Sequence, residues 1–156
     1  MRLVALVSLI VFVVDQISKW MVVHVMDLAR VGAIDLFPPY LNFRMAWNTG
    51  INFGLLSGHA DWTRWVLISV ALGIVLFVLV WMRRDPPGRM GLVFGGLLIG
   101  GALGNVVDRL LYGAVADFLN MSCCGISNPY AFNVADISVF IGAIGLALFP
   151  GSKNAP

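Results

Sequence analysis

Four long apolar segments constrain the fold of this chain more than any other feature. They cover residues 3–23, 62–82, 91–112 and 132–149, of which the last is the shortest. A helix needs roughly 20 predominantly apolar residues to cross a hydrocarbon core of about 30 Å. Only 12% of the chain is charged, about half the usual share in a soluble domain. We therefore predict an all-α integral membrane protein, with residues 1–156 forming a single membrane-embedded domain of four transmembrane helices.

Basic residues predict how these helices are oriented. The first segment lacks the cleavage site of a signal peptide and is expected to be a retained helix, so the loops alternate between the two sides of the membrane. One side then carries Arg2, Arg83, Arg84, Arg89 and Lys153, and the other carries Arg30, Arg44 and Arg64. Because cytoplasmic loops are enriched in lysine and arginine, we expect both termini in the cytoplasm.

The region between the first two apolar segments contains a strand pattern. In "LNFRMAWN", residues 41–48, the apolar side chains Leu41, Phe43, Met45 and Trp47 alternate with mostly polar ones. Alternation with a period of two is typical of a β-strand with one buried face. We therefore predict a small β-sheet lying on the outer surface of the membrane.

Under this topology, nearly all polar side chains of the four segments fall near one membrane boundary, the outer one. They are Asp15, Lys19, Asn105, Asp108, Arg109, Asn133 and Asp136, and Asp117 follows the third segment by a few residues. A charge at the centre of a membrane helix costs about 2.5–3.5 kcal/mol, so an embedded charge indicates a functional site by default. The common depth of these side chains therefore predicts one site at the outer boundary.

Several of these residues also have a purely structural explanation. Asp15 and Lys19 are four residues apart on one helical face, where they can form an intrahelical ion pair. Asp117 alone is compatible with a loop residue, and Asp136 alone with a cap at the start of the fourth helix. The shared depth of Asp117 and Asp136 favours a functional pair over two unrelated residues.

Glycine recurs every four residues in the third segment. Gly96, Gly100 and Gly104 share one helical face, which Asp108 continues. Small residues at this spacing let membrane helices approach closely. We expect this packing to direct Asp108 toward the protein interior rather than toward lipid.

Two carboxylates at one water-accessible site can hydrolyse a peptide bond. Repulsion between like charges and partial burial raise one pKa, so one carboxyl group stays protonated while the other acts as a base on water. A serine–lysine design is disfavoured because Ser18 and Lys19 are adjacent and point to different sides of a helix. His24 and His59 are too sparse for a metal cluster, so no metal or cofactor is expected.

The remaining composition excludes other classes of function. A formal net charge of +2 without a basic run does not indicate nucleic-acid binding. Cys123 and Cys124 are adjacent, which forms neither a disulfide framework nor a zinc spacing. A small transporter or proton-conducting protein is the main non-enzyme alternative. Such a path needs polar groups through the full bilayer depth, and the inner halves of the segments are nearly devoid of them.

Five sequence blocks in register resemble the lipoprotein signal peptidase (signal peptidase II) family over essentially the full chain. They are "DQISK" (15–19), "NTGINFG" (48–54), "GNVVDR" (104–109), "VADF" (115–118) and "FNVAD" (132–136). The resemblance implies a catalytic dyad of Asp117 and Asp136. It also implies supporting or substrate-contacting roles for Asp15, Lys19, Asn48, Gly50, Asn105, Asp108, Arg109 and Asn133. One departure is Asn52, where many members have a small residue.

The resemblance further implies an intramembrane aspartic endopeptidase of the bacterial inner membrane. Such an enzyme removes the signal peptide from diacylglyceryl-modified prolipoproteins by cutting just before the lipidated cysteine. The active site would lie near the periplasmic face, and cyclic peptide antibiotics of the globomycin type would bind in it. The sequence leaves open which lipoproteins are cut, which aspartate holds the proton and whether the protein is a monomer.

Overall fold

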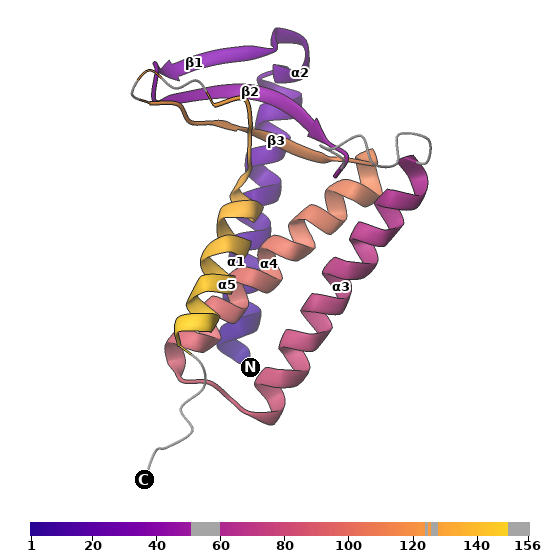
Figure 1. Cartoon of the computed structure of the whole chain (residues 1–156), viewed down its shortest axis with the longest axis vertical. Helices are drawn as coiled ribbons and strands as arrows, with labels where there is room; N and C mark the ends of the chain where they lie inside the picture. Colours follow the sequence, from indigo (N-terminus) through magenta and orange to yellow (C-terminus); the bar gives the residue numbers. More distant parts are fainter. Residues whose placement is uncertain (51–59, 124, 126–127, 150–156) are drawn as a thin grey trace.

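The computed structural model describes residues 1–50, 60–123, 125 and 128–149. Its helices form a bundle, and a small sheet covers one end of the bundle (Figure 1). The long helices are α1 (Arg2–Trp20), α3 (Ala60–Arg84), α4 (Arg89–Tyr112) and α5 (Val134–Leu148). The chain's N-terminus, the end of α5 and the α3–α4 connection all lie at the end away from the sheet (Figure 1).

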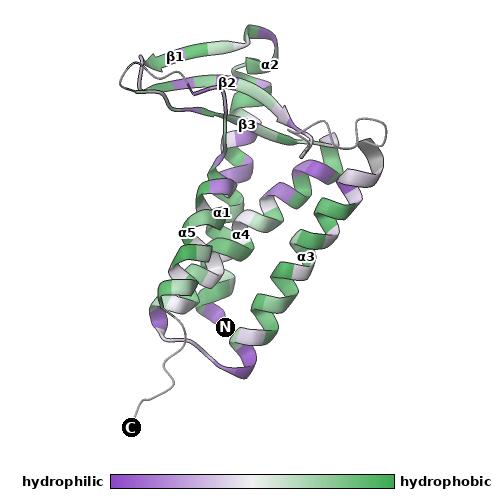
Figure 2. Ribbon diagram, in the orientation of Figure 1, coloured by the Kyte–Doolittle hydropathy of each residue, from purple (hydrophilic) through white to green (hydrophobic). Residues whose placement is uncertain are grey.

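Three helical segments in the described part of the chain are long and apolar enough to cross a membrane. They are Arg2–Val25, Trp62–Arg84 and Arg89–Tyr112, in agreement with the first three predicted spans. The fourth predicted span, 132–149, is helical only over the 15 residues of α5, which rise about 22 Å at 1.5 Å per residue. The helices are mainly hydrophobic along their length, with hydrophilic residues near the sheet and at the α3–α4 connection (Figure 2).

The sheet has three antiparallel strands in the order β1 (Ala33–Phe37), β2 (Leu41–Asn48) and β3 (Val115–Asn120). The predicted strand at 41–48 is confirmed as β2 with the same bounds. The structure places Asp117 within β3 rather than in a loop. Gly113 makes this possible, because its φ of +78° ends α4 in a left-handed turn that favours glycine.

The alternation predicted for β2 holds only in part. Phe43 and Met45 pack against the buried cluster of Val22, Leu28 and Phe118 beneath the sheet. Trp47, however, is 42% exposed and contacts the ring of Tyr112. The register between β2 and β3 shifts by one residue between Phe43 and Ala46, and such a bulge re-aims the side chains that follow it.

The glycine face of α4 packs directly on α1. A Cβ atom at Gly96 would meet Val7, one at Gly100 would meet the backbone of Ser8, and one at Gly104 would meet Asp15. The predicted close approach of helices is therefore confirmed, and it continues to the level of the polar side chains. Asp108, on the same face, is buried as expected.

We predict that Gly100→Ala destabilises the protein by about 1–3 kcal/mol, the usual cost of overpacking a well-packed interior. The added Cβ would lie 2.5 Å from the Ser8 carbonyl oxygen and 2.9 Å from its Cα, and backbone atoms cannot swing aside. Thermal unfolding in detergent micelles measures the effect. Gly73→Ala in α3 is the matched control, since nothing lies within 4 Å of its added Cβ. Equal stability of the two variants would contradict this account of the α1–α4 contact.

Candidate active site

The two candidate catalytic aspartates come from different elements that meet below the sheet. Asp117 lies in β3 and is only 3% exposed. Asp136 lies in the first turn of α5 and is half-buried. Each is the third residue of a Val-Ala-Asp sequence, 115–117 and 134–136, and both alanines are fully buried.

Asn133 contacts both of these carboxyl groups. Its Nδ2 donates a hydrogen bond to Asp117 Oδ1 at 2.6 Å, and its Oδ1 accepts one from the backbone N–H of Asp136 at 2.9 Å. The Asn133 backbone N–H donates in turn to Asp136 Oδ2 at 3.2 Å. These last two bonds form a capping box, which satisfies N–H groups left without partners at a helix start. Asp136 therefore caps α5, and the capping residue also holds Asp117.

Asn105 of α4 links Asp136 to Lys19. Its Nδ2 donates to Asp136 Oδ1 at 2.8 Å, and its Oδ1 accepts from Lys19 Nζ at 3.1 Å. A lysine ammonium group can only donate, so Lys19 requires the amide oxygen of Asn105 to face it. The amide nitrogen must then face Asp136, and the orientation of Asn105 is fixed by its neighbours.

Lys19 joins two further buried carboxylates below the aspartate pair. Its Nζ lies 2.8 Å from Asp15 Oδ2 and 2.7 Å from Asp108 Oδ2. The predicted pairing of Asp15 with Lys19 on one helical face is therefore confirmed, and Asp108 completes a buried three-residue ionic cluster. With Asn105, these contacts use all three hydrogens of the ammonium group.

The two supporting carboxylates hold the backbone on either side of the site. Asp15 Oδ1 accepts from the N–H of Ala135 at 2.8 Å, and Asp108 Oδ2 accepts from the N–H of Ala116 at 3.3 Å. Each of these alanines directly precedes one of the candidate catalytic aspartates. Through Asp15 and Asp108, Lys19 therefore positions the chain at both Val-Ala-Asp sequences.

The sequence prediction missed Gln16 as a member of this network. Its Nε2 lies 3.2 Å from Asp15 Oδ2 and 3.1 Å from Asp108 Oδ1, with the carbonyl oxygen of Gly104 at 3.4 Å. Gln16 therefore bridges α1 and α4 beside the ionic cluster. The polarity of Gln16 could have identified it from the sequence, because an amide side chain inside a membrane span needs a hydrogen-bonding partner.

Asn48, at the end of β2, completes the surroundings of Asp117. Its Nδ2 donates to Asp117 Oδ2 at 3.0 Å, and its Oδ1 accepts from the Gly50 N–H at 2.8 Å. Gly50 has a φ of +83°, which favours glycine. Of the two predicted residues in the "NTGINFG" block, Asn48 therefore contacts Asp117 directly, and Gly50 holds the side chain of Asn48. Asn52, the departure in that block, lies outside the described residues.

Arg109 lies at the edge of the site, where its charge interacts with those of Asp136, Asp117 and Asp108. Arg109 Nη1 donates to the Asn105 carbonyl oxygen at 3.3 Å and has no hydrogen bond to either candidate catalytic aspartate among the described contacts.

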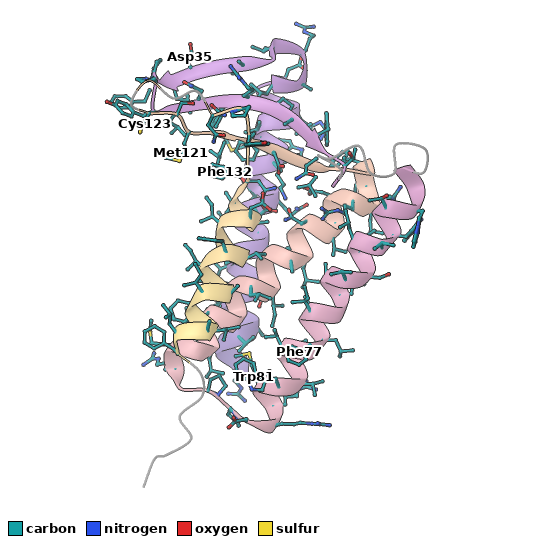
Figure 3. All side chains as sticks on the ribbon, viewed as in Figure 1. Asp35, Phe77, Trp81, Met121, Cys123 and Phe132 are labelled. Carbon is teal, nitrogen blue, oxygen red and sulfur yellow. The ribbon has the colours of Figure 1, made fainter. Side chains whose placement is uncertain are left out.

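Cys123 is exposed in the loop after β3 (Figure 3), and Cys124 lies outside the described residues. The exposed position of Cys123 gives no evidence of a role for the cysteines at the site.

The environment of Asp117 favours a protonated carboxyl group. Burial, together with the negative charge of Asp136, raises its pKa from 3.8 to about 6. The hydrogen bonds from Asn48 and Asn133 oppose this change, because they stabilise the ionised form. Asp117 thus titrates close to neutral pH, as a group that donates a proton in catalysis must.

An apolar groove between α3, α4 and α5 borders this site. It has a volume of about 300 Å³. We call it the three-helix groove, and it is lined by Leu67, Val70, Ala71, Ile74, Leu98, Ala102, Asn105, Arg109, Val139 and Ala143. A second, smaller hollow of about 230 Å³ lies on the sheet side of Asp117, between β2 and residues 129–131. Two hollows therefore border the polar network, one lined in part by Asn105 and the other by Asp117.

The chain is similar to known proteins over nearly its whole length. A family model described as signal peptidase (SPase) II matches residues 7–150. The lipoprotein signal peptidase of Rhodopseudomonas palustris is 35% identical over 148 residues, 93% of this chain and 89% of that protein. That of Shewanella loihica is 41% identical over 139 residues, 88% of this chain and 79% of that protein.

Solved structures show a similar fold. One of a bacterial membrane enzyme at 1.9 Å resolution superposes with a TM-score of 0.83 at 27% identity, covering 99% of this chain and 96% of that one. Another, at 2.3 Å resolution, superposes with a TM-score of 0.78 at 28% identity and covers 100% and 96% of the two chains. The similarity therefore includes the elements that carry the polar network.

Proposed function

The chain belongs to the signal peptidase II family of aspartic peptidases, which remove signal peptides from prolipoproteins, and we propose that Asp117 and Asp136 form its catalytic pair. The observation that carries this proposal is the position of Asn133, which hydrogen-bonds Asp117 through its side chain and Asp136 through its backbone and side chain. Two carboxyl groups held by one residue at the end of an apolar groove suit hydrolysis at a membrane surface.

In the proposed mechanism, Asp117 carries the proton and Asp136 is the base. Asp136 takes a proton from water as the water oxygen attacks the scissile carbonyl carbon, and Asp117 gives its proton to the carbonyl oxygen. Asp136 then passes its proton to the leaving amine as the C–N bond breaks, and Asp117 recovers a proton from the collapsing tetrahedral intermediate. Because interacting carboxyl groups titrate as a pair, the rate depends on the state with one shared proton.

This assignment predicts a rate that falls as the pH rises through about 6, because Asp117 then loses the proton that it must donate. Asn48→Ala removes a hydrogen bond that stabilises ionised Asp117. The pKa of Asp117 should therefore rise, and the alkaline limb should move to higher pH by up to about one unit. The pH profile of kcat/KM measures this shift, with Arg44→Ala on the same strand as control. A limb that moved to lower pH would contradict the assignment of the proton to Asp117.

The three-helix groove is the proposed binding site for the signal-peptide helix. Ala71, Ala102 and Ala143 line it, and small side chains let a membrane helix approach closely. Asn105 and Arg109 lie at its polar part, and Asn105 contacts Asp136. A substrate helix in this groove would therefore present its outer end to the catalytic pair, and globomycin-type cyclic peptides would compete for the same site.

The proposal includes a placement in the bacterial inner membrane. α5 is the fourth span of a single peptidase domain, both termini lie in the cytoplasm, and the sheet rests on the periplasmic surface. The support is the position of Arg2, Arg83, Arg84 and Arg89 at the end of the bundle away from the sheet, as expected for a cytoplasmic side. The catalytic pair then lies near the periplasmic face.

The proposed substrate is a prolipoprotein whose cysteine carries a diacylglyceryl group, and the cut falls just before that cysteine. We expect purified enzyme in lipid bilayers to cleave the lipid-modified precursor at least about a hundredfold faster than the same precursor without lipid. A hundredfold difference in kcat/KM corresponds to about 2.7 kcal/mol, well within the free energy of burying acyl chains. Mass spectrometry of the products locates the cut. Equal cleavage of the two precursors would exclude the proposed substrate class.

A further inference from the structure

A second apolar groove lies beside the three-helix groove on another part of α5. It has a volume of about 490 Å³ and is lined by Phe132, Asp136, Ile137, Phe140 and Ile141. We call it the α5 groove. Phe132 stands between the sheet and the start of α5 (Figure 3). The groove thus begins at the sheet end of the bundle and follows the outer turns of α5.

Asp136 lines the α5 groove, and Asn105 links it to the three-helix groove. At about 100° per helical residue, Ala143 of the three-helix groove lies about 20° to one side of Asp136. Phe140 of the α5 groove lies about 40° to the other side. Two apolar surfaces therefore border one proposed catalytic carboxylate, the α5 groove directly and the three-helix groove through Asn105, which donates to Asp136. This arrangement suits a substrate with two apolar parts that are joined near the scissile bond.

The walls of the two grooves differ in what they can accept. The three-helix groove is formed by α3, α4 and α5 and contains three alanines, which suits a packed helix. The α5 groove is lined by α5 and by Phe132, two residues before the helix begins, and its apolar side chains are phenylalanine and isoleucine. Phe140 is 67% exposed. Bulky side chains keep a second helix backbone at a distance, whereas a flexible chain can lie along them.

Resting on the function proposed above, we propose that the α5 groove binds the acyl chains of the diacylglyceryl group on the substrate cysteine. This cysteine directly follows the scissile bond, so its lipid starts beside the catalytic pair, of which Asp136 lines the α5 groove. If the signal-peptide helix fills the three-helix groove, the lipid is left with the other apolar surface at Asp136. The α5 groove would then contribute to the selection of lipid-modified precursors.

Acyl-chain length provides the first test. Wild-type enzyme is compared with Phe140→Ala on two precursors that differ only in the lipid, one with dipalmitoyl and one with dibutyryl glycerol. We expect Phe140→Ala to lower kcat/KM for the long-chain precursor roughly tenfold and to reduce the preference for long chains by a similar factor. Phe77→Ala is the matched control, because Phe77 is 69% exposed on α3 near the opposite end of the bundle (Figure 3). An unchanged preference in Phe140→Ala would overturn the inference.

Photo-crosslinking locates the chains directly. A precursor with a diazirine in its acyl chains is bound to the Asp117→Asn variant, and labelled residues are identified by mass spectrometry. We expect labels within residues 137–141, at levels above those from a phospholipid that carries the same diazirine. Labels on residues 67–74 of α3, or equal labelling by the phospholipid, would overturn the inference. If Asp117→Asn instead cleaved the precursor rapidly, the proposed catalytic pair would be wrong, a result distinct from either labelling pattern.

Discussion

Replacing Asp117 or Asp136 by asparagine is expected to lower the turnover of a lipid-modified prolipoprotein by at least about a thousandfold. General acid–base groups typically contribute between about a hundredfold and ten thousandfold to a rate. An asparagine cannot accept a proton from water as a carboxylate does, and it cannot donate one as a carboxylic acid does. Single-turnover cleavage in lipid bilayers, with enzyme in excess, measures both variants.

Both asparagine variants should remain folded. At position 136, an amide oxygen can still accept the hydrogen bond from the Asn133 N–H that completes the capping box. Asp35→Asn is the matched control, since Asp35 lies exposed on β1 at the outer part of the sheet (Figure 3). We expect the control to cleave at the wild-type rate. Near wild-type turnover by Asp117→Asn or Asp136→Asn would rule out the proposed pair.

Lys19→Met is expected to have the largest effect on stability. The substitution leaves Asp15 and Asp108 buried without the cation that lies 2.8 Å and 2.7 Å from them. Removing one partner of a buried ion pair typically costs about 3–5 kcal/mol. Since both carboxylates also hold the alanine N–H groups next to the catalytic pair, the variant should lose activity as well as stability.

Thermal unfolding in detergent micelles measures the stability of this variant. Arg30→Met is the matched control, because Arg30 lies 3.2 Å from Asp27 in an ion pair whose side chains are 86% and 53% exposed. Exposed pairs contribute at most about 1 kcal/mol, so we expect little change in the control. Adding Asp108→Asn to Lys19→Met should restore part of the stability by removing one unpaired charge. Equal stability of Lys19→Met and Arg30→Met would contradict the buried cluster.

The elements that follow from local sequence patterns were predictable. Apolar runs predicted the first three membrane helices, and a period of two predicted β2. The glycines of α4 predicted its close contact with α1, and the common depth of the polar side chains indicated that they form one network. Each of these features depends on the spacing of residues within a single element.

The features that depend on contacts between elements were not predictable. No strand was predicted around Asp117, because β3 becomes a strand only by pairing with β2. The β2 bulge depends on that same pairing, so the exposure of Trp47 had no local signal. The link from Lys19 through Asp15 to Ala135 joins residues 120 positions apart along the chain. The two Val-Ala-Asp sequences are visible in the chain, but their shared support by Lys19 appears only in three dimensions.

The most direct test of a single catalytic pair compares the Asp117→Asn/Asp136→Asn double variant with the two single variants. Residues that act as one unit show strongly non-additive losses, because removing either one already abolishes their joint function. We predict that the double variant cleaves the lipid-modified precursor at about the rate of the slower single variant. If each substitution instead lowered the rate independently, so that the double variant lost the product of the two factors, Asp117 and Asp136 would not form one active site.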